Sequence, residues 1–301
     1  WHGQTPDWVF AGNVPPPAPP PDVAPPPVPP AVGAGAGAQT SPANPPRRRP
    51  RRSFGYAGPR ATREELLQRM REHIHTVVGR YKGKIKVWDV VNEALSDNGP
   101  DTLRNSLWVQ IIGPDFIAKA FEYAHEADPQ ATLRYNDYGL ENPVKRQKLI
   151  TLIKELQAKK VPVMAIGTQT HVSISSPSYA DADRTLTELE SLGLPVHVTE
   201  LDVNSAESGQ RNTGADVANN AATTQGGLVA NTDQRLADQY ANLFRVFRKH
   251  KQVKVVTLWG VNDGVSWRAN GKPLLFDTND QPKPAFEAVL RAAKDNAAGS
   301  K

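Results

Sequence analysis

From Thr62 onward, apolar and polar residues follow one another in a pattern that indicates regular secondary structure. Thr62 and Glu65 form a capping-box signature, which is typical of the start of a helix. Apolar residues then recur at helical spacing, at Leu66, Leu67, Met70, Ile74, Val77 and Val78. The run at 84–91 is strand-like. This part of the chain therefore predicts a helix followed by a strand.

Helical and strand-like patterns continue to alternate up to the C-terminus. Asn142 followed by Pro143 is a favourable helix start, because asparagine caps the first turn and proline suits its first position. Further helices are predicted near 114–127, 143–160, 181–192, 233–250 and 284–296, and further strands near 132–137, 162–167, 194–200 and 253–259. Strands that alternate with helices form βα units around a parallel sheet. The pattern therefore predicts an α/β fold.

The pattern contains five strands, whereas a closed (β/α)8 barrel needs eight. We interpret residues 1–10 as the remnant of an earlier βα unit. Residues 60–301 are then the C-terminal part of an incomplete barrel-type domain with about five βα units. The chain also begins at Trp1-His2 without a signal peptide, which we interpret as processing or truncation at the N-terminus.

Residues 11–59 differ in composition from the rest of the chain. They contain 16 of the 27 prolines, a Gly-Ala run at 33–38 and five arginines at 47–52. Such a segment buries too little apolar surface to offset the entropy lost on ordering. A linker, a ligand for SH3-type domains and a localisation signal are functional interpretations. We favour a disordered insertion or an error in gene modelling, and a proline-rich interaction protein is the least favoured function.

The net charge of +5 belongs to this tract and not to a basic groove. The chain has 36 basic and 31 acidic residues, and without the five arginines and Asp22 of the tract it has 31 and 30. Nucleic acid is therefore not an expected partner. The chain has no cysteine, no apolar run long enough for a membrane span and no histidine spacing typical of a zinc site. We expect no cofactor, no metal and no membrane partner.

Polar residues gather where each of the five predicted strands ends. They are Asn92 and Glu93, then Asn136, Asp137 and Tyr138, then Gln169 and His171, then Glu200 and Asp202, and finally Trp259, Asp263 and Trp267. One such residue alone is more often a cap or a satisfied loop residue. Five consecutive strands with polar ends instead indicate the active site of a βα barrel, which lies at the C-terminal ends of its strands.

Two glutamates on separate strands suggest cleavage of glycosidic bonds, which requires one protonated carboxyl group and one ionised carboxylate. Glu200 and Asp202 are two residues apart on a strand, so their side chains face the same way. His171 is the candidate histidine that one of them orients. Tryptophans suit sugar rings, although Trp88, inside an apolar strand, is interpreted as a core residue.

Several segments resemble family 10 of the glycoside hydrolases, the endo-β-1,4-xylanases. They are Trp88-Asp-Val-Val-Asn-Glu-Ala94, Asn136-Asp-Tyr138, Gly167-Thr-Gln-Thr-His171, Val198-Thr-Glu-Leu-Asp202, Trp259-Gly-Val-Asn-Asp263 with Trp267, and the ending Pro273-Leu-Leu-Phe-Asp277 with Gln281-Pro-Lys-Pro-Ala-Phe286. The order is that of the family, and the resemblance runs from about Arg60 to the C-terminus. Trp1-His-Gly-Gln-Thr-Pro-Asp-Trp8 also resembles the end of the family's third strand.

The resemblance implies a (β/α)8 barrel and a role for each matching residue. Glu93 is implied as acid/base and Glu200 as nucleophile, on the fourth and seventh strands of the full barrel. Asn92 is implied to bind the 2-hydroxyl of the sugar, and His171, held by Asp202, to contact Glu200 and keep it ionised. The implied substrate contacts are completed by Gln169, Trp259 and Trp267 along the sugar-binding cleft, Tyr138 on the leaving-group side, and Trp1 and Gln4 on the glycone side.

The chain also departs from the family. The first two βα units and most of the third strand have no counterpart, and the tract 11–59 replaces a short loop. Two hypotheses therefore stay open: an active retaining endo-xylanase, or a catalytically incompetent fragment that at most binds carbohydrate. Xylan or xylo-oligosaccharide is the implied partner, and the complete protein is expected to be a monomer. Secretion is expected, because polymeric xylan lies outside the cell.

Overall fold

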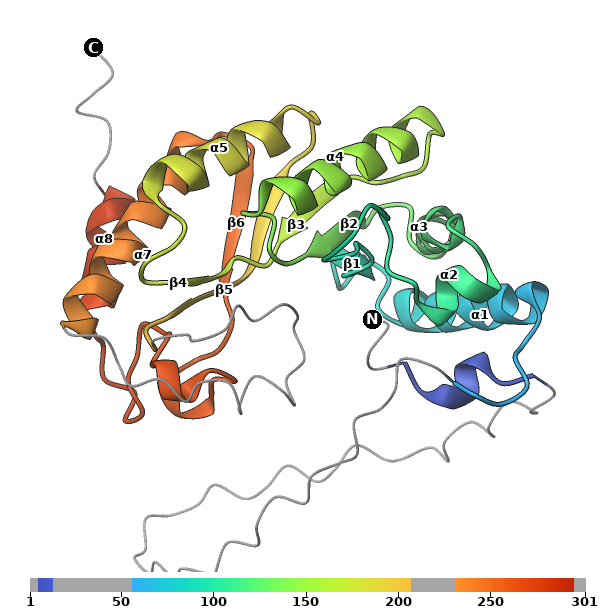
Figure 1. The fold of residues 1–301 in the computed structure, drawn as a ribbon, viewed down its shortest axis with the longest axis horizontal. Helices are drawn as coiled ribbons and strands as arrows, with labels where there is room; N and C mark the ends of the chain where they lie inside the picture. The colour runs from blue at the N-terminus through green and yellow to red at the C-terminus, as the bar shows by residue number, and fades with distance from the viewer. Residues whose placement is uncertain (1–4, 13–55, 207–230, 295–301) are drawn as a thin grey trace, which may run out of the picture.

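The computed structural model describes residues 5–12, 56–206 and 231–294, and in this part of the chain a six-stranded sheet forms the centre (Figure 1). The strands are β1 (Val87–Asn92), β2 (Thr132–Asp137), β3 (Ala165–Thr168), β4 (His171–Ser173), β5 (Val196–Asn204) and β6 (Val253–Leu258). β1, β2, β3, β5 and β6 lie side by side in parallel, and the short β4 pairs with the end of β5. The predicted α/β fold with five successive βα units is confirmed.

Helices surround this sheet on its outer side, from α1 and α3 near β1 to α7 and α8 near the far end (Figure 1). They are α1 (Arg63–Arg80), α2 (Leu107–Ile111), α3 (Phe116–Ala127), α4 (Pro143–Ala158), α5 (Tyr179–Glu190), α7 (Thr232–Lys249) and α8 (Pro284–Lys294). The described residues also contain three short 3-10 helices, which are η1 (Asp7–Phe10), η2 (Asp263–Val265) and η3 (Ala269–Gly271). None of the helices in the described ranges has the length and apolar character needed to cross a membrane.

The local signals for helix starts have the expected geometry. Thr62 Oγ1 accepts a hydrogen bond from the backbone N–H of Glu65 at 3.1 Å, and the Glu65 carboxylate accepts one from the Thr62 N–H at 2.7 Å. Asn142 directly precedes Pro143, and its Oδ1 accepts a hydrogen bond from the N–H of Val144 at 2.9 Å. These bonds satisfy backbone donors that the first turn of a helix leaves free.

The two faces of the sheet carry different residues. Leu133 and Tyr135 of β2 are fully buried in the core, and their neighbour Arg134 lies on the other face because side chains alternate along a strand. Arg134 forms two bonds with the Asp89 carboxylate of β1, at 2.6 and 2.8 Å, and its Nη1 lies 2.9 Å from Nδ1 of His197 on β5. The apolar face therefore packs against the helices, and the other face carries polar side chains toward the strand ends.

The N-terminal segment packs against α1 and α2. Phe10 is buried, and its ring meets that of Trp108 edge-on at 5.1 Å. Arg69 of α1 donates to the carbonyl oxygens of Val9 and Ala11 at 2.8 and 2.6 Å. Ala11 also forms an antiparallel bridge with Arg60, so that the two ends of the tract 11–59 lie side by side. Residues 13–55 lie outside the described residues, and the interpretation of this tract stays a prediction.

The predicted boundaries are wrong by a few residues where turns or short strands intervene. The first strand begins at Val87 instead of 84, because Lys84 and Ile85 turn back and donate to the Tyr81 carbonyl. The strand predicted at 194–200 continues to Asn204, because β4 pairs with its last three residues. Neither β4 nor α2 was predicted, because three and five residues are too few for a recognisable hydrophobic period.

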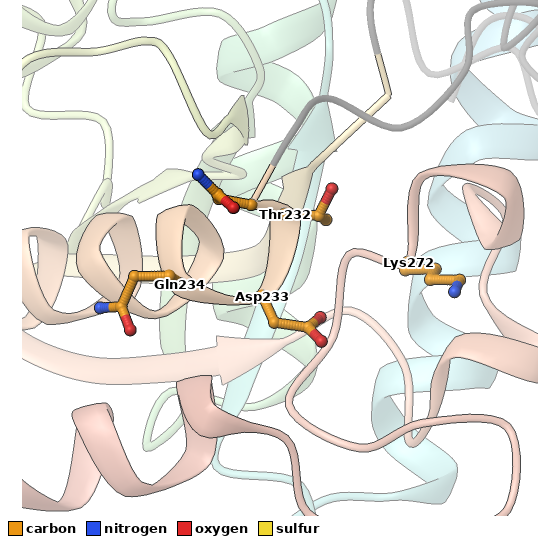
Figure 2. Close-up of a pocket in the computed structure, with 5 residues that line it drawn as sticks. Thr232, Asp233, Gln234 and Lys272 are labelled. Carbon is orange, nitrogen blue, oxygen red and sulfur yellow. The ribbon is translucent and has the colours of Figure 1, made fainter.

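Two hollows lie away from the paired centre of the sheet. A cavity of about 920 Å³ opens beside β1, where no second strand pairs with β1 among the described residues, and Met70, Trp88 and Trp108 are part of its mostly apolar lining. Trp88 also packs against the core, as predicted. The other hollow, of about 540 Å³, lies at the start of α7 and is lined by Asn231, Thr232, Asp233, Gln234 and Lys272 (Figure 2). It contains none of the predicted site residues.

Candidate active site

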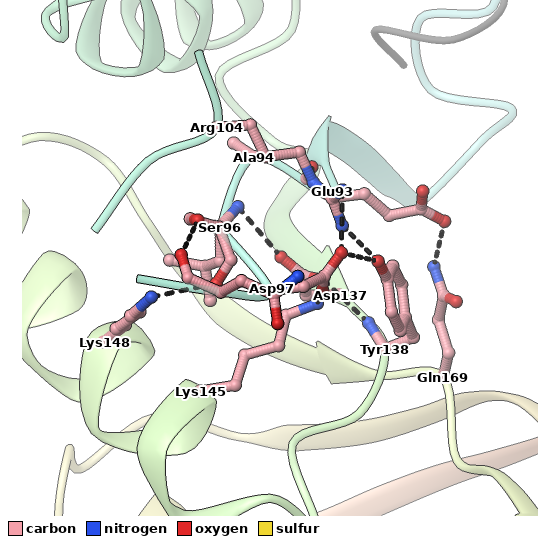
Figure 3. A network of polar contacts seen from close by, with 12 residues as sticks. Glu93, Ala94, Ser96, Asp97, Arg104, Asp137, Tyr138, Lys145, Lys148 and Gln169 are labelled. Atoms are coloured by element: carbon pink, nitrogen blue, oxygen red, sulfur yellow. Dashed lines mark hydrogen bonds and ion pairs between the residues drawn. The ribbon is translucent and has the colours of Figure 1, made fainter. Parts of the chain in front are cut away.

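Glu93 follows β1 directly and has an unusual backbone conformation. Its φ of 59° lies in the left-handed region, which few residues other than glycine adopt. Its N–H donates to the carbonyl of Asn136 at 2.9 Å, and its carboxyl Oε1 accepts from Nε2 of Gln169 at 2.9 Å (Figure 3). Glu93 is only 3% exposed, so this carboxyl group is removed from bulk water.

Glu200 lies in the middle of β5 and has a different set of partners. Its Oε1 accepts from Nδ2 of Asn136 at 3.0 Å, and its Oε2 lies 3.2 Å from Nε2 of His171. Thr199, the preceding residue, donates to Oδ1 of Asn136 at 2.8 Å. That bond fixes which end of the Asn136 amide faces Glu200, because Oδ1 is already occupied as an acceptor.

A chain of side-chain amides joins the two carboxyl groups. Asn92 Oδ1 accepts from Nδ2 of Asn136 at 2.9 Å and from Nε2 of Gln169 at 3.3 Å. Asn136 also donates to Glu200, and Gln169 also donates to Glu93. The two predicted carboxylates therefore lie at the same end of the sheet, linked through three amides that come from β1, β2 and the end of β3.

Asp202 orients the histidine beside Glu200. It is fully buried, and its Oδ2 lies 3.1 Å from Nδ1 of His171. The indole Nε1 of Trp267 donates to the same oxygen at 2.6 Å, and Nη1 of Arg268 donates to Oδ1 at 2.9 Å. A buried carboxylate needs such donors to offset the loss of hydration. The imidazole is thus held between two carboxylates, with Asp202 on Nδ1 and Glu200 on Nε2.

The charge state of His171 reflects this position. Burial lowers the pKa of His171, but the charge of Asp202 and the contacts with Asp202 and Glu200 outweigh burial and raise the pKa above its ordinary value. The imidazole ring therefore holds its proton more strongly than an isolated histidine would.

Two tryptophans flank the histidine. The Trp267 ring meets the His171 ring edge-on at 4.9 Å, and the Trp259 ring lies 6.4 Å from it. Trp259 is 46% exposed, which is high for so large an apolar side chain. An indole surface beside a carboxylate offers the apolar face that a sugar ring contacts.

The sequence profile described as glycosyl hydrolase family 10 matches residues 54–292. The chain belongs to this family. It is a glycoside hydrolase whose described part contains five parallel βα units of a TIM-barrel fold. The resemblance seen in the motifs is therefore confirmed across most of the chain.

Relatives of known identity agree with the family. An endo-1,4-beta-xylanase of Geobacillus stearothermophilus is 43% identical over 237 residues, which cover 76% of this chain and 68% of the relative. The endo-1,4-beta-xylanase A of Caldicellulosiruptor sp. (strain Rt8B.4) is 43% identical over 230 residues, which cover 76% of this chain and 32% of the relative. The chain thus spans about two-thirds of the first relative and about a third of the second.

A solved structure of the family is also similar. A mutant of TsXylA, the intracellular xylanase of Thermoanaerobacterium saccharolyticum, in complex with xylotetraose is 37% identical, with a TM-score of 0.69. The match covers 96% of this chain and 72% of that one.

Tyr138 of this family 10 hydrolase lies within a charged cluster (Figure 3). Its hydroxyl donates to Oδ2 of Asp97 at 2.6 Å and accepts from the Arg104 guanidinium. Nζ of Lys145 lies 3.4 Å from the centre of its ring and bonds to the carboxylates of Asp97 and Asp137 at 2.8 and 2.9 Å. Burial and the neighbouring Asp97 raise the pKa of Tyr138, although Arg104 acts in the opposite direction. The phenol therefore remains protonated as a donor.

Asp263, which was singled out in the sequence, does not join this arrangement. Asp263 accepts from the N–H of Leu274 and pairs with Lys283, both at 2.9 Å, so it holds a loop and contacts no site residue in these bonds. Trp1 and Gln4 lie outside the described residues, and their implied roles stay predictions.

Three cations of the site, Arg104, Lys145 and Arg268, were not predicted from the sequence. One of them carried a recognisable signal. Lys145 occupies the same face of α4 as Leu149 and Ile153, and it is only 4% exposed. A lysine in an apolar stripe is rarely buried without a charged partner.

Among the described residues, no group of three or more histidine and carboxylate side chains is arranged to hold a metal ion.

Proposed function

We propose that this family 10 hydrolase cleaves internal β-1,4-xylosidic bonds of xylan with retention of anomeric configuration. Glu93 acts as acid/base and Glu200 as nucleophile. The observation that carries the proposal is the chain of amides through Asn136, Asn92 and Gln169, which joins two carboxyl groups in different surroundings. Glycoside hydrolysis needs two such groups in different protonation states.

In the first step, protonated Glu93 gives its proton to the glycosidic oxygen, and the bond from that oxygen to the anomeric carbon breaks. A carboxylate oxygen of Glu200 attacks the anomeric carbon and forms a glycosyl ester. The leaving chain departs with a free hydroxyl group. Glu93 is then ionised, and Glu200 carries the sugar.

In the second step, ionised Glu93 takes a proton from water as the water oxygen attacks the anomeric carbon. The ester bond to Glu200 breaks, and the sugar leaves with its original configuration. Glu93 is protonated again and Glu200 is ionised, so both residues return to their starting states.

The contacts of each carboxyl group support these roles. Glu200 accepts from the Asn136 amide and faces His171, whose raised pKa favours a positive charge near the nucleophile. Glu93 is buried, and its carboxyl group accepts a hydrogen bond from the neutral Gln169 amide. An ionised nucleophile and a protonated acid fit these two environments.

The substrate contacts follow from the resemblance and from the similar xylanases. Asn92 is proposed to bind the 2-hydroxyl of the sugar whose bond is cleaved, and Gln169, Trp259 and Trp267 to line the cleft around it. Tyr138 is proposed to lie on the leaving-group side. The similar TsXylA, whose mutant was solved with xylotetraose, supports a xylose polymer as the substrate.

Proton NMR of the first sugar released from xylohexaose tests the mechanism. We expect the β anomer to form first and to mutarotate later. Initial release of the α anomer would show inversion and refute the nucleophilic role of Glu200. A crystal structure adds a second criterion, because retaining enzymes hold the two carboxyl groups about 5–5.5 Å apart and inverting enzymes about 6.5–9.5 Å apart.

A carbohydrate-binding role without turnover is the second candidate, and the cavity beside β1 favours it. Trp88 and Met70 line this cavity of about 920 Å³ together with other, mostly apolar, side chains. If strands that the catalytic arrangement requires are lacking, the chain binds sugar without cleaving it. Calorimetry with xylohexaose, combined with product analysis, separates the candidates: heat of binding without products supports the second.

We also propose that the protein acts outside the cell, because xylan is a polymer too large to enter. We propose in addition that the complete protein is a monomer. Detection of the protein in culture medium rather than in cell lysate tests the location. Size-exclusion chromatography with light scattering tests the monomer.

A further inference from the structure

We propose that Arg104 is a positioning residue for the acid/base glutamate, an inference that rests on the proposed function of Glu93. The Arg104 side chain donates to the backbone carbonyl of Glu93. Its role is to hold the left-handed backbone conformation from which the Glu93 side chain reaches Gln169.

The conformation of Glu93 requires support from its surroundings. A side chain beyond glycine is strained at a φ of 59°, and such residues persist where neighbouring groups fix them. Nε of Arg104 donates to the Glu93 carbonyl oxygen at 2.9 Å, directly at the strained peptide (Figure 3). The backbone N–H of Arg104 also donates to the carbonyl of Ala94 at 2.9 Å. Arg104 therefore holds two consecutive carbonyl groups, one with its side chain and one with its backbone.

Arg104 is itself fixed by charge. Its Nη1 pairs with Oδ2 of Asp97 at 2.9 Å, and its Nη2 donates to the Tyr138 hydroxyl. Asp97 in turn pairs with Lys145 at 2.8 Å, and Lys145 pairs with Asp137 at 2.9 Å. A planar guanidinium offers five donors in fixed directions, so it can serve the carbonyl, the carboxylate and the phenol together. A lysine in its place would keep the charge but lack this geometry.

The same cluster also holds the next peptide groups. The N–H of Ala94 donates to the Tyr135 hydroxyl at 3.1 Å, and the N–H of Leu95 donates to Asp137 at 3.3 Å. These two bonds hold the residues that follow Glu93, whereas the Arg104 side chain bonds to the carbonyl of Glu93 itself. Loss of Arg104 should therefore release Glu93 without unfolding the segment that follows it.

A misplaced acid has a distinctive kinetic signature. Proton donation matters for the poor leaving groups of xylan and hardly matters for a dinitrophenolate, which departs without a proton. A binding or folding defect would instead affect both substrates alike. Because Arg104 makes no proposed contact with substrate, its loss should change kcat and leave KM near the parent value.

The experiment compares Arg104→Lys and Arg104→Gln with the parent chain on xylohexaose and on 2,4-dinitrophenyl β-xylobioside. We expect kcat/KM, which reports the first step, to fall about 30-fold on xylohexaose in Arg104→Gln, part of the 10²–10⁴-fold that general acid catalysis contributes, and less than about 3-fold on the aryl substrate. Arg104→Lys should show the same selectivity with a smaller loss. Equal losses on both substrates would overturn the proposal.

Arg146→Lys is the matched control. This buried arginine also donates to backbone carbonyls, those of Leu140 and Glu141, and pairs with Glu188, but none of these residues contacts Glu93 in the bonds described. The Arg146→Lys substitution should lower the melting temperature without changing the ratio of the activities on xylohexaose and on the aryl substrate. A changed ratio in Arg146→Lys would mean that any loss of a buried arginine disturbs the site, and would also overturn the proposal.

A crystal structure of Arg104→Lys gives a readout that does not depend on turnover. We expect the Glu93 carboxyl group to lie beyond hydrogen-bond distance of Gln169, or the Glu93 φ to leave the left-handed region. An unchanged Glu93 overturns the proposal even if the parent is inactive. A parent that hydrolyses neither substrate refutes the proposed function instead, so the two failures are distinguishable.

Discussion

The two carboxyl groups of the site are held by different kinds of structure. Glu200 lies on β5, which pairs with β3, β4 and β6, and its partners Asn136 and His171 also come from strands. Glu93 follows β1, which pairs only with β2 among the described residues. Its backbone is held by Arg104 from a loop and through it by Asp97 and Lys145.

This difference indicates that the two groups depend on different interactions. The position of Glu200 follows from the regular geometry of a parallel sheet, in which neighbouring strands fix each other in register. The position of Glu93 depends on a strained backbone and a buried set of charges, which hold their geometry only while every member is paired. We therefore expect the β5 region and the β1 region to respond differently to substitution and to pH.

Removal of the nucleophile should have the largest effect. Glu200→Ala should lower kcat on xylan and on aryl xylosides by more than about 10⁴-fold, because no group remains to form the glycosyl intermediate. Hydrolysis of both substrates is measured by reducing-sugar and chromogenic assays. Glu122→Ala is the control, since Glu122 lies on α3 and bonds to Lys119 at the surface. Residual activity within 100-fold of the parent would contradict the nucleophilic role.

Removal of the acid/base should depend on the substrate. Glu93→Ala should lower kcat on xylan by about 10²–10⁴-fold, the usual contribution of general acid–base catalysis. An aryl xyloside with a good leaving group should still form the intermediate, so a rapid burst should precede a slow second step. Azide should accelerate that step and give a β-xylosyl azide. An α product, or no rescue in a folded variant, would argue against a retaining acid/base.

The sequence alone predicts the part of the site around Glu200, which lies on the sheet, better than the part around Glu93, which a loop residue holds. Alternation within β5 places Glu200 and Asp202 on one side, and both contact His171 in the structure. That inference needs only the two-residue period of a strand. Asn92 and Asn136, which the sequence places at the ends of successive strands, share a hydrogen bond at 2.9 Å.

The charged cluster around Glu93 could not be derived from a local pattern. Lys145 and Asp97 are 48 residues apart, and Arg104 and Tyr138 are 34 apart. No period or motif specifies such pairs, because they form only after the sheet and the loops have met. The left-handed backbone at Glu93 also lacked a signal, since glycine is the residue that normally marks this conformation.

Packing should be tighter behind the paired strands than beside β1. Leu149 of α4 is fully buried, so Leu149→Ala should lower the free energy of unfolding by about 3 kcal/mol. Ile74 of α1 is only partly buried and lines the cavity of about 920 Å³, so Ile74→Ala should lower the free energy of unfolding by about 1 kcal/mol. Urea unfolding at neutral pH measures both. Equal losses would mean that Ile74 is packed as tightly as Leu149.

The smallest predicted effects are opposite pH dependences of the two regions. In the β5 region, burial lowers the pKa of His171 but Asp202 and Glu200 raise it above the ordinary 6.5. The protonated ring therefore stabilises the fold fully below that value, and this stabilisation is lost as pH rises through the folded pKa. In the β1 region, burial raises the pKa of Asp97 but Lys145, Tyr138 and Arg104 lower it below the ordinary 3.8. The Asp97 contribution is therefore present above 3.8 and lost as pH falls through the folded pKa.

Two single variants separate these contributions. Asp202→Asn should remove part of the alkaline loss of stability, because His171 then lacks the charge that raises its pKa. Asp97→Asn should remove part of the acid loss and leave the alkaline side unchanged. Each tenfold difference in proton affinity between the folded and unfolded states corresponds to about 1.4 kcal/mol. Urea unfolding free energies of the parent and both variants, measured at intervals between about pH 3 and pH 9 at constant ionic strength, give the two slopes. If Asp202→Asn changed only the acid slope, or Asp97→Asn only the alkaline one, the assignment of these charges to the two regions would be wrong.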